Sequence, residues 1–575
     1  MKNLEISEIF SKMADILELK DDNIFKINAY RKASRILKDL QEDVEDLQRS
    51  NSLKEIPGFG KAIVGKIEEY LVYGKIIRYE ELKHEISKEL IKLLKIQNLG
   101  PKTVVLANKK LNVQNINDLK RVIEDGSLTR LPGMGEKKVA NIKKNVEYYL
   151  KSQTRITLGS ALPIAEKIVD LLKDKFGDEK FAIAGSIRRR KETTGDIDIL
   201  AASKNGKEII NTFINLPMVT DVISKGETKS SIRINDGFQV DLRVVELGSF
   251  GAALQYFSGS QAHNIKLRGL AKRKSLKINE YGVFKNEKKV CGANEEEIYK
   301  SLGLSWIAPE MREDRGELEL AMENKLPDLI DQNDIKGDLH VHSKYSDGHA
   351  SIAEMAEAAQ KLGYAYLAIC DHSKAAYYAD GVNEEQLLEQ GKEIDTLNDK
   401  INGFKILKGI EVDILPDGSL DFSDEILKQL DIVAASIHSA FKQSPTNRII
   451  KAMENPYVDI IAHPTSRLIN IREAYEIDLN RIFEKAAETG TALELNSHPD
   501  RLDLSDRNTK RASDLGVKIA INTDSHRIKH LKNMKYGIGT ARRAWLNKNN
   551  VLNCFSYKDL FEWRNTRIKK YEKNQ

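Results

Sequence analysis

The chain has 575 residues, of which 41% are hydrophobic and 31% charged, with a formal net charge of +5. This length supports several domains, each with its own core. No run of eighteen apolar residues occurs, residues 1–10 lack an apolar signal segment, and the three cysteines are far apart; we therefore expect neither a membrane protein nor a disulfide-stapled secreted one, but a cytoplasmic protein.

The charge is unevenly distributed along the chain. Residues 1–300 carry about +12, residues 301–335 about −6, and the remainder is close to neutral. A basic front part suits a polyanionic partner, because Lys and Arg release counterions when they contact phosphates. Charge alone leaves a second interpretation open, namely solvated helix faces with a mild excess of basic residues.

Residues 1–150 carry apolar side chains at three- and four-residue spacing, which predicts helices. Three glycine-containing connections interrupt this pattern: IPGFGK (56–61), NLGPK (98–102) and LPGMGE (131–136). Glycine permits positive φ and lets a phosphate approach the backbone. The amides at the start of the following helix can then hold that phosphate.

The three connections resemble the helix-hairpin-helix motif, which binds the DNA backbone without reading its sequence. The resemblance implies DNA-binding roles for Gly58, Gly60, Gly100, Gly133 and Gly135. The middle copy departs from the motif, since Asn98 stands where the first glycine is usual. The alternative for each copy is an ordinary glycine-containing connection between helices.

Carboxylates interrupt apolar strands in the next segment. A strand over 181–184 ends in GSIRRR (185–190), and the segments GDIDIL (195–200) and FQVDLRVV (238–245) follow. Asp196 and Asp198 share one face because side chains alternate along a strand, and Asp241 supplies a third carboxylate. We expect these buried-strand carboxylates to need cations between them; solvent-facing aspartates on edge strands are the alternative. Two divalent ions would clamp the attacking and leaving oxygens of a phosphoryl displacement, and the Gly185–Ser186 turn with Arg189 would hold a triphosphate.

These three segments resemble the nucleotidyltransferase palm of family X DNA polymerases, the group that includes DNA polymerase beta. The resemblance implies that Asp196, Asp198 and Asp241 bind two Mg²⁺ or Mn²⁺ ions. Residues 256–264 resemble the nucleotide-selecting segment of that family, and residues 277–282 match its thumb. The implied nucleotide-binding residues are Gly185, Ser186, Arg189, Gly195, Tyr256, Phe257, Gly259, Asn264 and Arg268.

The N-terminus resembles the small lyase domain of DNA polymerase beta through residues 25–31 and the first hairpin. On this resemblance Lys66 takes the place of the Schiff-base lysine, whereas Ala62 replaces a companion lysine. An active lysine of this kind needs a depressed pKa. A surface helix lysine is the alternative interpretation of Lys66, and 5′-deoxyribose-phosphate lyase activity stays open.

Beyond residue 335, seven apolar runs of strand length each stop at His, Asp or Glu, and nine of the eleven histidines lie there. In a parallel barrel the C-terminal strand ends converge on one face. Imidazoles and carboxylates from successive strands suit a cluster of two or three metal ions. This pattern predicts a metallohydrolase, with runs that end at His340/His342, His372, Glu411, His438, His463, His498 and Asp524/His526.

This segment resembles the PHP (polymerase and histidinol phosphatase) domain, a distorted (β/α)7 barrel. The resemblance implies nine ligands for up to three ions, compatible with Zn²⁺, Mn²⁺ or Fe²⁺. His498 lies outside that set, so we expect His498, Asn496 and Arg501 as substrate contacts only, and Asp371 as a residue that orients a ligand. The nine implied ligands are His340, His342, Asp347, His372, Glu411, His438, His463, Asp524 and His526.

We therefore expect a multidomain chain of mixed α+β and α/β class. The resemblance implies a family X polymerase that fills gaps in base excision repair on gapped or primer-template DNA with deoxynucleoside triphosphates. It further implies a monomer with 3′→5′ exonuclease activity, and with possible cleavage at abasic sites. Three alternatives stay open: a fused small-molecule phosphatase, a DNA-binding scaffold with a structural barrel, and a template-independent nucleotidyltransferase. The expected segments are a lyase-like domain (1–85), a fingers-like helical domain (86–152), a palm (153–248), a thumb (249–315), a linker (316–335) and the PHP barrel (336–575).

Overall fold

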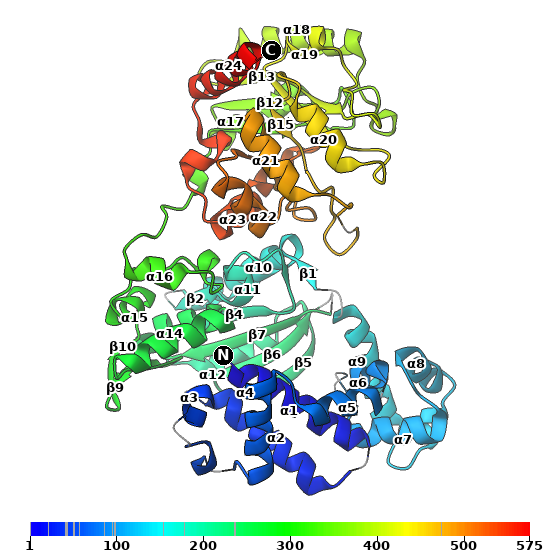
Figure 1. Cartoon of the computed structure of the whole chain (residues 1–575), viewed down its shortest axis with the longest axis vertical. Coiled ribbons are helices and arrows are strands. Elements are labelled where there is room, and N and C mark those ends of the chain that lie inside the picture. Colours follow the sequence, from blue (N-terminus) through cyan, green and yellow to red (C-terminus); the bar gives the residue numbers. More distant parts are fainter. Residues whose placement is uncertain are drawn as a thin grey trace. The chain divides into compact units, whose positions relative to one another are not determined.

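The computed structural model describes the chain except residues 1, 21, 41–43, 50, 51, 57, 86, 95, 97, 98, 153, 154, 178, 235, 236, 473 and 575. The chain folds into two compact units, Met1–Thr154 and Arg155–Gln575 (Figure 1). Pro57 and Asn98 of the hairpin patterns, and the expected boundary at residue 153, lie outside the described residues. Across the described part of the chain, no helix combines the length and the apolar character that crossing a membrane demands.

The first unit is helical, as its apolar spacing predicted. One core gathers around Phe10, Ile63 and Ile67, and a second around Val104 and Ile142. The helices around the first core include the pair joined by residues 56–61, and those around the second core are joined by residues 98–102 and 131–136. The helices are α1 (Lys2–Leu19), α2 (Ile24–Asp39), α3 (Val44–Arg49), α4 (Lys61–Tyr73), α5 (Ile77–Glu85), α6 (Lys88–Leu93), α7 (Pro101–Leu111), α8 (Ile116–Glu124) and α9 (Glu136–Ser152), with 3-10 turns η1 (Ser52–Glu55) and η2 (Ser127–Arg130).

The second unit begins with a mixed five-stranded sheet in the order β2-β4-β7-β6-β5. The central strands β4 and β7 are parallel, and the other pairs are antiparallel. Alternation gives the sheet two different faces: Ile197 and Val240 pack in the core with α10 and α12, whereas Leu200 packs toward α13. The elements are β1 (Ile156–Thr157), α10 (Leu158–Phe176), β2 (Lys180–Ile183), α11 (Gly185–Arg188), β3 (Thr193–Thr194), β4 (Ile197–Ala202), α12 (Gly206–Ile214), β5 (Val219–Lys225), β6 (Lys229–Ile234) and β7 (Gln239–Val245).

A smaller helical region with a three-stranded sheet follows the five-stranded sheet. Its core includes the fully buried Arg312, whose guanidinium donates to Glu295 at 2.6 Å and to the carbonyl of Ile307. Part of the segment expected as a linker is helical and packs here, because Leu318 and Ala321 belong to the same core. The elements are α13 (Phe250–Ser258), α14 (Gln261–Arg273), β8 (Lys277–Asn279), β9 (Gly282–Lys285), β10 (Lys288–Cys291), α15 (Glu295–Ser301) and α16 (Glu317–Met322).

Seven parallel strands, in the chain order β11 to β17, form the barrel and confirm the predicted (β/α)7 architecture. Its helices surround the strands in Figure 1. The strands are β11 (Gly337–Val341), β12 (Tyr366–Ile369), β13 (Lys405–Asp413), β14 (Ile432–Ser436), β15 (Ile460–Ile461), β16 (Ala492–Asn496) and β17 (Ile519–Asn522). The helices are α17 (Ile352–Lys361), α18 (Glu384–Asn398), α19 (Asp424–Leu427), α20 (Pro445–Met453), α21 (Leu479–Thr489), α22 (Asp506–Asp514), α23 (Met534–Arg543) and α24 (Tyr557–Asn574).

The barrel has a seam where its first and last strands meet. Among the described residues, β11 and β17 share no continuous ladder; an isolated bridge joins Val341 to Ser525. Side chains take the place of ladder bonds, since the Leu339 amide donates to Asn522 Oδ1 at 3.3 Å. Thr523 Oγ1 also donates to Asp338 Oδ2 at 2.5 Å across the same seam.

Two buried arginines attach the C-terminal helix to the barrel. Asp459, just before β15, is fully buried and accepts from Arg564 Nε at 2.9 Å and from Arg567 Nη2 at 2.5 Å. We predict that Asp459→Ala lowers the free energy of unfolding by about 3–5 kcal/mol, because it leaves two buried guanidiniums without their carboxylate.

Urea unfolding of the full chain measures this loss. Asp395→Ala is the matched control, since the Asp395–Lys408 ion pair spans 2.7 Å but its carboxylate is 61% exposed, and such pairs contribute less than about 1 kcal/mol. Equal stability losses for the two variants would contradict the prediction.

Candidate active sites

The first and third hairpins have the same backbone geometry. Gly58 (φ +105°) and Gly133 (φ +74°) adopt the left-handed region, and the amide of the following residue, Phe59 or Met134, donates back across the turn at 3.0–3.1 Å. Both of these following side chains are buried, so each hairpin is anchored while its backbone stays at the surface. Gly60 and Gly135 directly precede α4 and α9, and Gly100 is the N-cap of α7.

Two of the predicted catalytic aspartates lie side by side in the centre of the five-stranded sheet. Asp198 on β4 is the register partner of Asp241 on β7. Both lie on the face opposite α10 and α12, because their sequence neighbours Ile197 and Val240 point into that core. Asp196 precedes β4 and is exposed, while Asp198 and Asp241 are half-buried. The expectation that all three are buried is therefore wrong for Asp196, because β4 begins one residue after it.

Nearby basic residues offset the negative charge of this group only in part: Arg189 and Lys229 act on Asp198, and Arg155 acts on Asp196. Burial, followed by the carboxylates of Asp196 and Asp241, raises the pKa of Asp198 to about 7. Burial and then Asp241 also raise the pKa of Asp196. Such shifts mark carboxylates that repel one another, and divalent cations would relieve that repulsion. The donor set therefore fits Mg²⁺ or Mn²⁺.

The turn after β2 fits closely against Asp198. Gly185 has φ +62°, and a Cβ at this position would lie 2.0 Å from Asp198 Oδ2, so only glycine lets the turn approach this carboxylate. Ser186 Oγ bonds Thr194 Oγ1 at 2.5 Å. Gly195 is exposed in the bend two residues before β4, the strand that carries Asp198.

The predicted triphosphate residue Arg189 lies beside the nucleotide-selecting segment. Its Nε donates to Glu313 Oε1 at 3.1 Å and its Nη1 donates to the carbonyl of Ser258. Burial lowers the pKa of Arg189, although Glu313 opposes that shift. The sequence pattern did not indicate this partner, since 124 residues separate the two side chains.

Residues 256–264 form a tightly bonded corner between α13 and α14. Asn264 Nδ2 donates to the carbonyl of Tyr256 at 2.7 Å and its Oδ1 accepts from Gln255. Arg243 of β7 stacks over the ring of Phe257 at 4.6 Å. Gly259 has φ +70° at the turn between the helices. These contacts hold the corner on the sheet face that carries the aspartates.

Two further predicted residues lie on helices. Arg268 is half-buried on α14, about one turn after Asn264, and Lys66 is half-buried on α4. The structure thus keeps both interpretations of Lys66 open.

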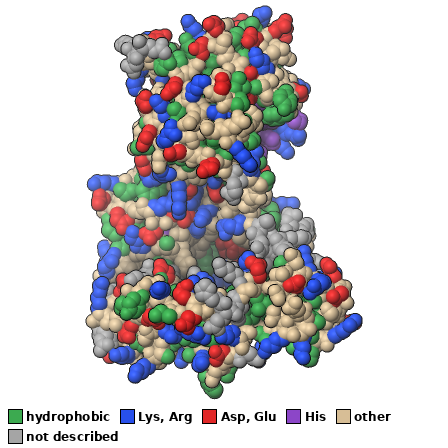
Figure 2. All heavy atoms as spheres, turned by 45° about the vertical axis from the view of Figure 1, so that its right-hand side comes forward, with side chains coloured by type: hydrophobic (Ala, Val, Ile, Leu, Met, Phe, Trp, Pro, Cys, Tyr) green, Lys and Arg blue, Asp and Glu red, His purple; other side chains and the backbone are tan. Residues whose placement is uncertain are grey.

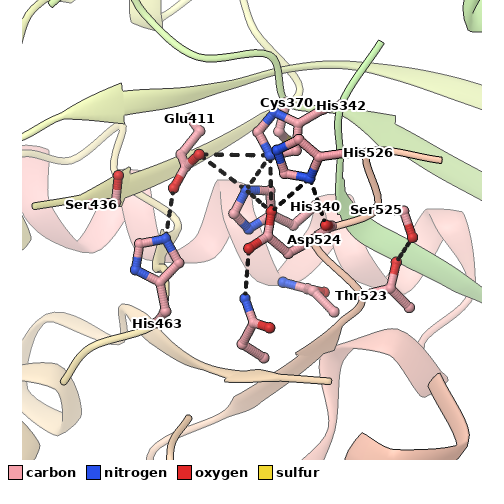
Figure 3. A network of polar contacts seen from close by, with 12 residues as sticks. His340, His342, Cys370, Glu411, Ser436, His463, Thr523, Asp524, Ser525 and His526 are labelled. Carbon is pink, nitrogen blue, oxygen red and sulfur yellow. Dashed lines mark hydrogen bonds and ion pairs between the residues drawn. The ribbon is translucent and has the colours of Figure 1, made fainter. Parts of the chain in front are cut away.

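The barrel gathers eight of the nine predicted ligands into three overlapping groups, each with donor atoms within 4.8 Å of one another. The ninth, His463, lies beside them with Nε2 3.0 Å from Glu411 Oε1 (Figure 3). His340 lies on β11 and His342 directly after it, and Glu411 of β13 lies within 4.0 Å of five of the imidazoles. The groups are His342, Asp347, His372 and His526; His340, His342 and Asp524; and His372, Glu411 and His438.

The imidazoles of this cluster differ in charge state. Although burial lowers both values, Glu411 raises the pKa of His438 to about 10 and Asp347 raises the pKa of His526 to about 9, so a bound metal would displace protons from these two rings. Burial and the rings of His526 and His372 lower the pKa of His342 to about 3, which keeps this imidazole neutral. Despite its burial, the pKa of Glu411 falls well below its usual value because His372, His438 and His340 surround it. Neutral imidazole and ionised carboxylate are the forms that ligate metals. The buried Nδ1 atoms of His342 and His463 also find no hydrogen-bond partner among the described residues, so the donor set fits a metal cluster.

Two residues that orient ligands were missed by the sequence analysis. Glu494 on β16 accepts from His340 Nδ1 at 2.8 Å and from the amide of His463 at 2.7 Å. Asp413 at the end of β13 bonds His438 Nδ1 at 3.3 Å. Such partners fix the orientation of a ligating imidazole. A signal was present for Glu494, which interrupts the apolar run ALELN just as Asp241 interrupts β7.

The residues expected around the cluster have different placements. Asn496 is fully buried and donates to Asp524 Oδ2 at 3.0 Å, and Arg501 Nε lies 3.8 Å from the same oxygen. His498 is a third exposed and belongs to none of the ligand groups among the described residues. Asp371 accepts from Ser343 and Gln390 rather than from an imidazole, so it fixes the segment after β11 instead of orienting a ligand directly. On the face in Figure 2, histidine is visible at one edge of the upper part, beside Lys and Arg.

Four family models match the chain in the order of these sites. They are a helix-hairpin-helix domain over residues 1–76, a SAM-like helix-hairpin-helix tandem over 90–146, the DNA polymerase beta thumb over 253–313 and the PHP domain over 338–498. Together with the paired aspartates and the histidine cluster, these matches define a nucleotidyltransferase fused to a metal-binding PHP barrel.

A relative that matches nearly the whole chain narrows this class further. The DNA polymerase/3′-5′ exonuclease PolX of Bacillus subtilis (strain 168) is 41% identical over 568 residues, which is 97% of this chain and 99% of the relative. A probable phosphatase of Thermoanaerobacter sp. (strain X514) is 35% identical over 231 residues, or 38% of this chain and 89% of the relative. The chain belongs to the family X DNA polymerases that carry a PHP domain.

Proposed function

We propose that the protein is a DNA-directed DNA polymerase that fills short gaps during base excision repair, and that its barrel shortens 3′ ends. The observation that carries the polymerase role is the register pair Asp198–Asp241, against which the Gly185 turn packs closely. The family membership supports the combination of both activities in one chain.

In the palm, Asp196, Asp198 and Asp241 would hold two Mg²⁺ or Mn²⁺ ions. Such ions neutralise the charge that develops on the attacking and leaving oxygens. Asp241, which accepts a hydrogen bond from Gln239 at 2.9 Å, would help activate the primer 3′-hydroxyl. Gly185, Ser186 and Arg189 would position the triphosphate.

Other residues would select the nucleotide and hold the DNA. The backbone beside Tyr256 and Phe257, with Gly259 at the turn, would crowd a ribose 2′-hydroxyl, Asn264 would contact the incoming base and Arg268 the template. The backbone amides of Gly60 and Gly135, and those at the first residues of α4 and α9, would contact DNA phosphates. A lyase role for Lys66 rests on the resemblance alone.

In the barrel, the nine ligands would hold two or three ions of Zn²⁺, Mn²⁺ or Fe²⁺. Such ions lower the pKa of a bound water and bind phosphate oxygens. Glu494 and Asp413 hold the imidazoles of His340 and His438 in place. Arg501, close to Asp524, would bind the phosphate of a 3′ end, and the same centre would serve cleavage at abasic sites.

A labelled primer tests both activities in one experiment. Full-length protein is mixed with Mn²⁺ and a 5′-labelled primer annealed beside a short gap, with and without deoxynucleotides. We expect extension when nucleotides are present and shortening when they are absent. A chain that shows no extension would contradict the polymerase role.

The similarity to a probable phosphatase favours one second candidate, a barrel that hydrolyses small phosphomonoesters. The full chain is assayed with such a monoester and with single-stranded DNA. Turnover of the monoester without attack on DNA would favour the phosphatase, whereas release of 3′ nucleotides supports the exonuclease.

A further inference from the structure

A barrel side chain reaches the residues of the polymerase site. Arg543, the last residue of α23, is 5% exposed, and its Nη1 donates to Glu313 Oε1 at 3.0 Å and to the carbonyl of Arg189 at 2.8 Å. Its Nη2 donates to Asp506 Oδ2 at 2.9 Å. One guanidinium of the barrel is therefore bonded to both the backbone and the ion-pair partner of the expected triphosphate residue.

Glu313 is shared between two arginines. The same oxygen, Oε1, accepts from Arg543 and from Arg189 Nε. Burial alone would raise the pKa of Glu313, but Arg543 and then Arg189 lower it below its usual value. Both guanidiniums thus neutralise this buried carboxylate.

This sharing bears on how freely Arg189 can bind an anion. A buried carboxylate holds an opposite charge strongly when nothing else neutralises it. With Arg543 in place, Glu313 keeps a cationic partner when Arg189 turns to another anion. Without Arg543, movement of Arg189 toward a triphosphate would leave Glu313 buried and unpaired, which costs free energy.

We propose that Arg543 of the barrel is a positioning residue for nucleotide binding by the palm, because it neutralises Glu313 and so releases Arg189 for the triphosphate. The proposal rests on the proposed role of Arg189. It makes the barrel a working part of the polymerase site, separate from the metal cluster that serves hydrolysis.

Single-nucleotide incorporation by the full-length protein tests the proposal through KM and kcat. We expect Arg543→Ala to raise KM for the nucleotide about tenfold and to change kcat less than about twofold, as for a loss of substrate binding. In Arg543→Ala/Glu313→Gln the uncompensated carboxylate is gone, so KM returns to within about twofold of the original value. A purely structural role of Arg543 would not give this rescue.

Lys535→Ala is the matched control. Lys535 lies on the same helix and pairs with Glu166 of α10 at 3.3 Å, at the same junction of barrel and palm but away from Arg189. We expect its KM to stay unchanged. An equal rise in the control would overturn the proposal, since any weakening of the junction would then suffice.

Further variants distinguish a failure of the proposed Arg543 coupling from a failure of the proposed triphosphate site at Arg189. Arg543→Lys keeps the positive charge and should keep KM within about threefold of the original value; a rise as large as in Arg543→Ala overturns the proposal. An unchanged KM in Arg543→Ala, or no rescue by Glu313→Gln, also overturns it. Arg189→Ala tests the premise: an unchanged KM there would refute the triphosphate site itself, whereas a raised KM with no effect of Arg543→Ala refutes only the coupling.

Discussion

Replacing Asp198 by alanine will lower the rate of templated nucleotide addition by at least about 10³-fold, because the variant loses a metal ligand at the reacting atoms. Burial and then the charges of Asp196 and Asp241 raise the pKa of Asp198, so the substitution removes a carboxylate that is coupled to both of the others. Extension of a 5′-labelled primer across a short gap, with quantified rates, measures the effect.

The same preparation supplies the controls for this variant. Shortening of a 3′ end should persist in Asp198→Ala, since none of the barrel ligands comes from the palm. Asp221→Ala removes a carboxylate from the edge strand β5 of the same sheet and should leave extension within about twofold of the original rate. Retained templated extension in Asp198→Ala would overturn the assignment of the palm site.

The double variant His340→Ala/His342→Ala will lose 3′ shortening and keep nucleotide addition, which is the reverse of the result expected for Asp198→Ala. These two rings contribute to two of the three ligand groups, so their loss should reduce 3′ shortening by at least about 10³-fold. Nucleotide addition should stay within about threefold of the original rate. Both rates are measured on one labelled primer, with and without deoxynucleotides.

His349→Ala is the control for the barrel. His349 lies in the same region and pairs with Arg527 at 3.0 Å. It belongs to none of the ligand groups in the described part of the chain. Its shortening activity should be retained. If the His340→Ala/His342→Ala variant still shortens DNA at the original rate, the cluster is not the hydrolytic site.

The architecture of the barrel could be predicted from the sequence because the same short pattern, an apolar run that ends at His, Asp or Glu, recurs seven times. Each of the seven parallel strands is a short apolar run, and six of the runs deliver ligands at their C-terminal ends, as the periodicity required. The β16 run differs: its terminal His498 lies outside the ligand groups of the described residues, while Glu494 within the strand bonds His340. Alternation along a strand fixes which residues share a face, but not which of them meets a ring from another strand.

In the palm, too, positions within a strand could be predicted, whereas contacts between residues far apart in the sequence could not. The paired positions of Asp198 and Asp241 follow from alternation and from neighbouring parallel strands. The partners of Arg189 do not, because Glu313 and Arg543 lie 124 and 354 residues away along the chain. Side-chain contacts over such separations depend on the packing of whole elements, and no spacing rule indicates them.

The seam of the barrel has a consequence for how metal depletion experiments should be interpreted. His340 and His342 belong to one side of the seam, and Asp524 and His526 to the other. An ion bound by both sides would therefore fasten together two strands that share no continuous ladder among the described residues. Metal that binds the folded form alone adds its binding free energy to folding. Chelation should therefore lower the melting temperature of the barrel as well as its hydrolytic rate, and should expose the seam to amide exchange before any other part of the sheet.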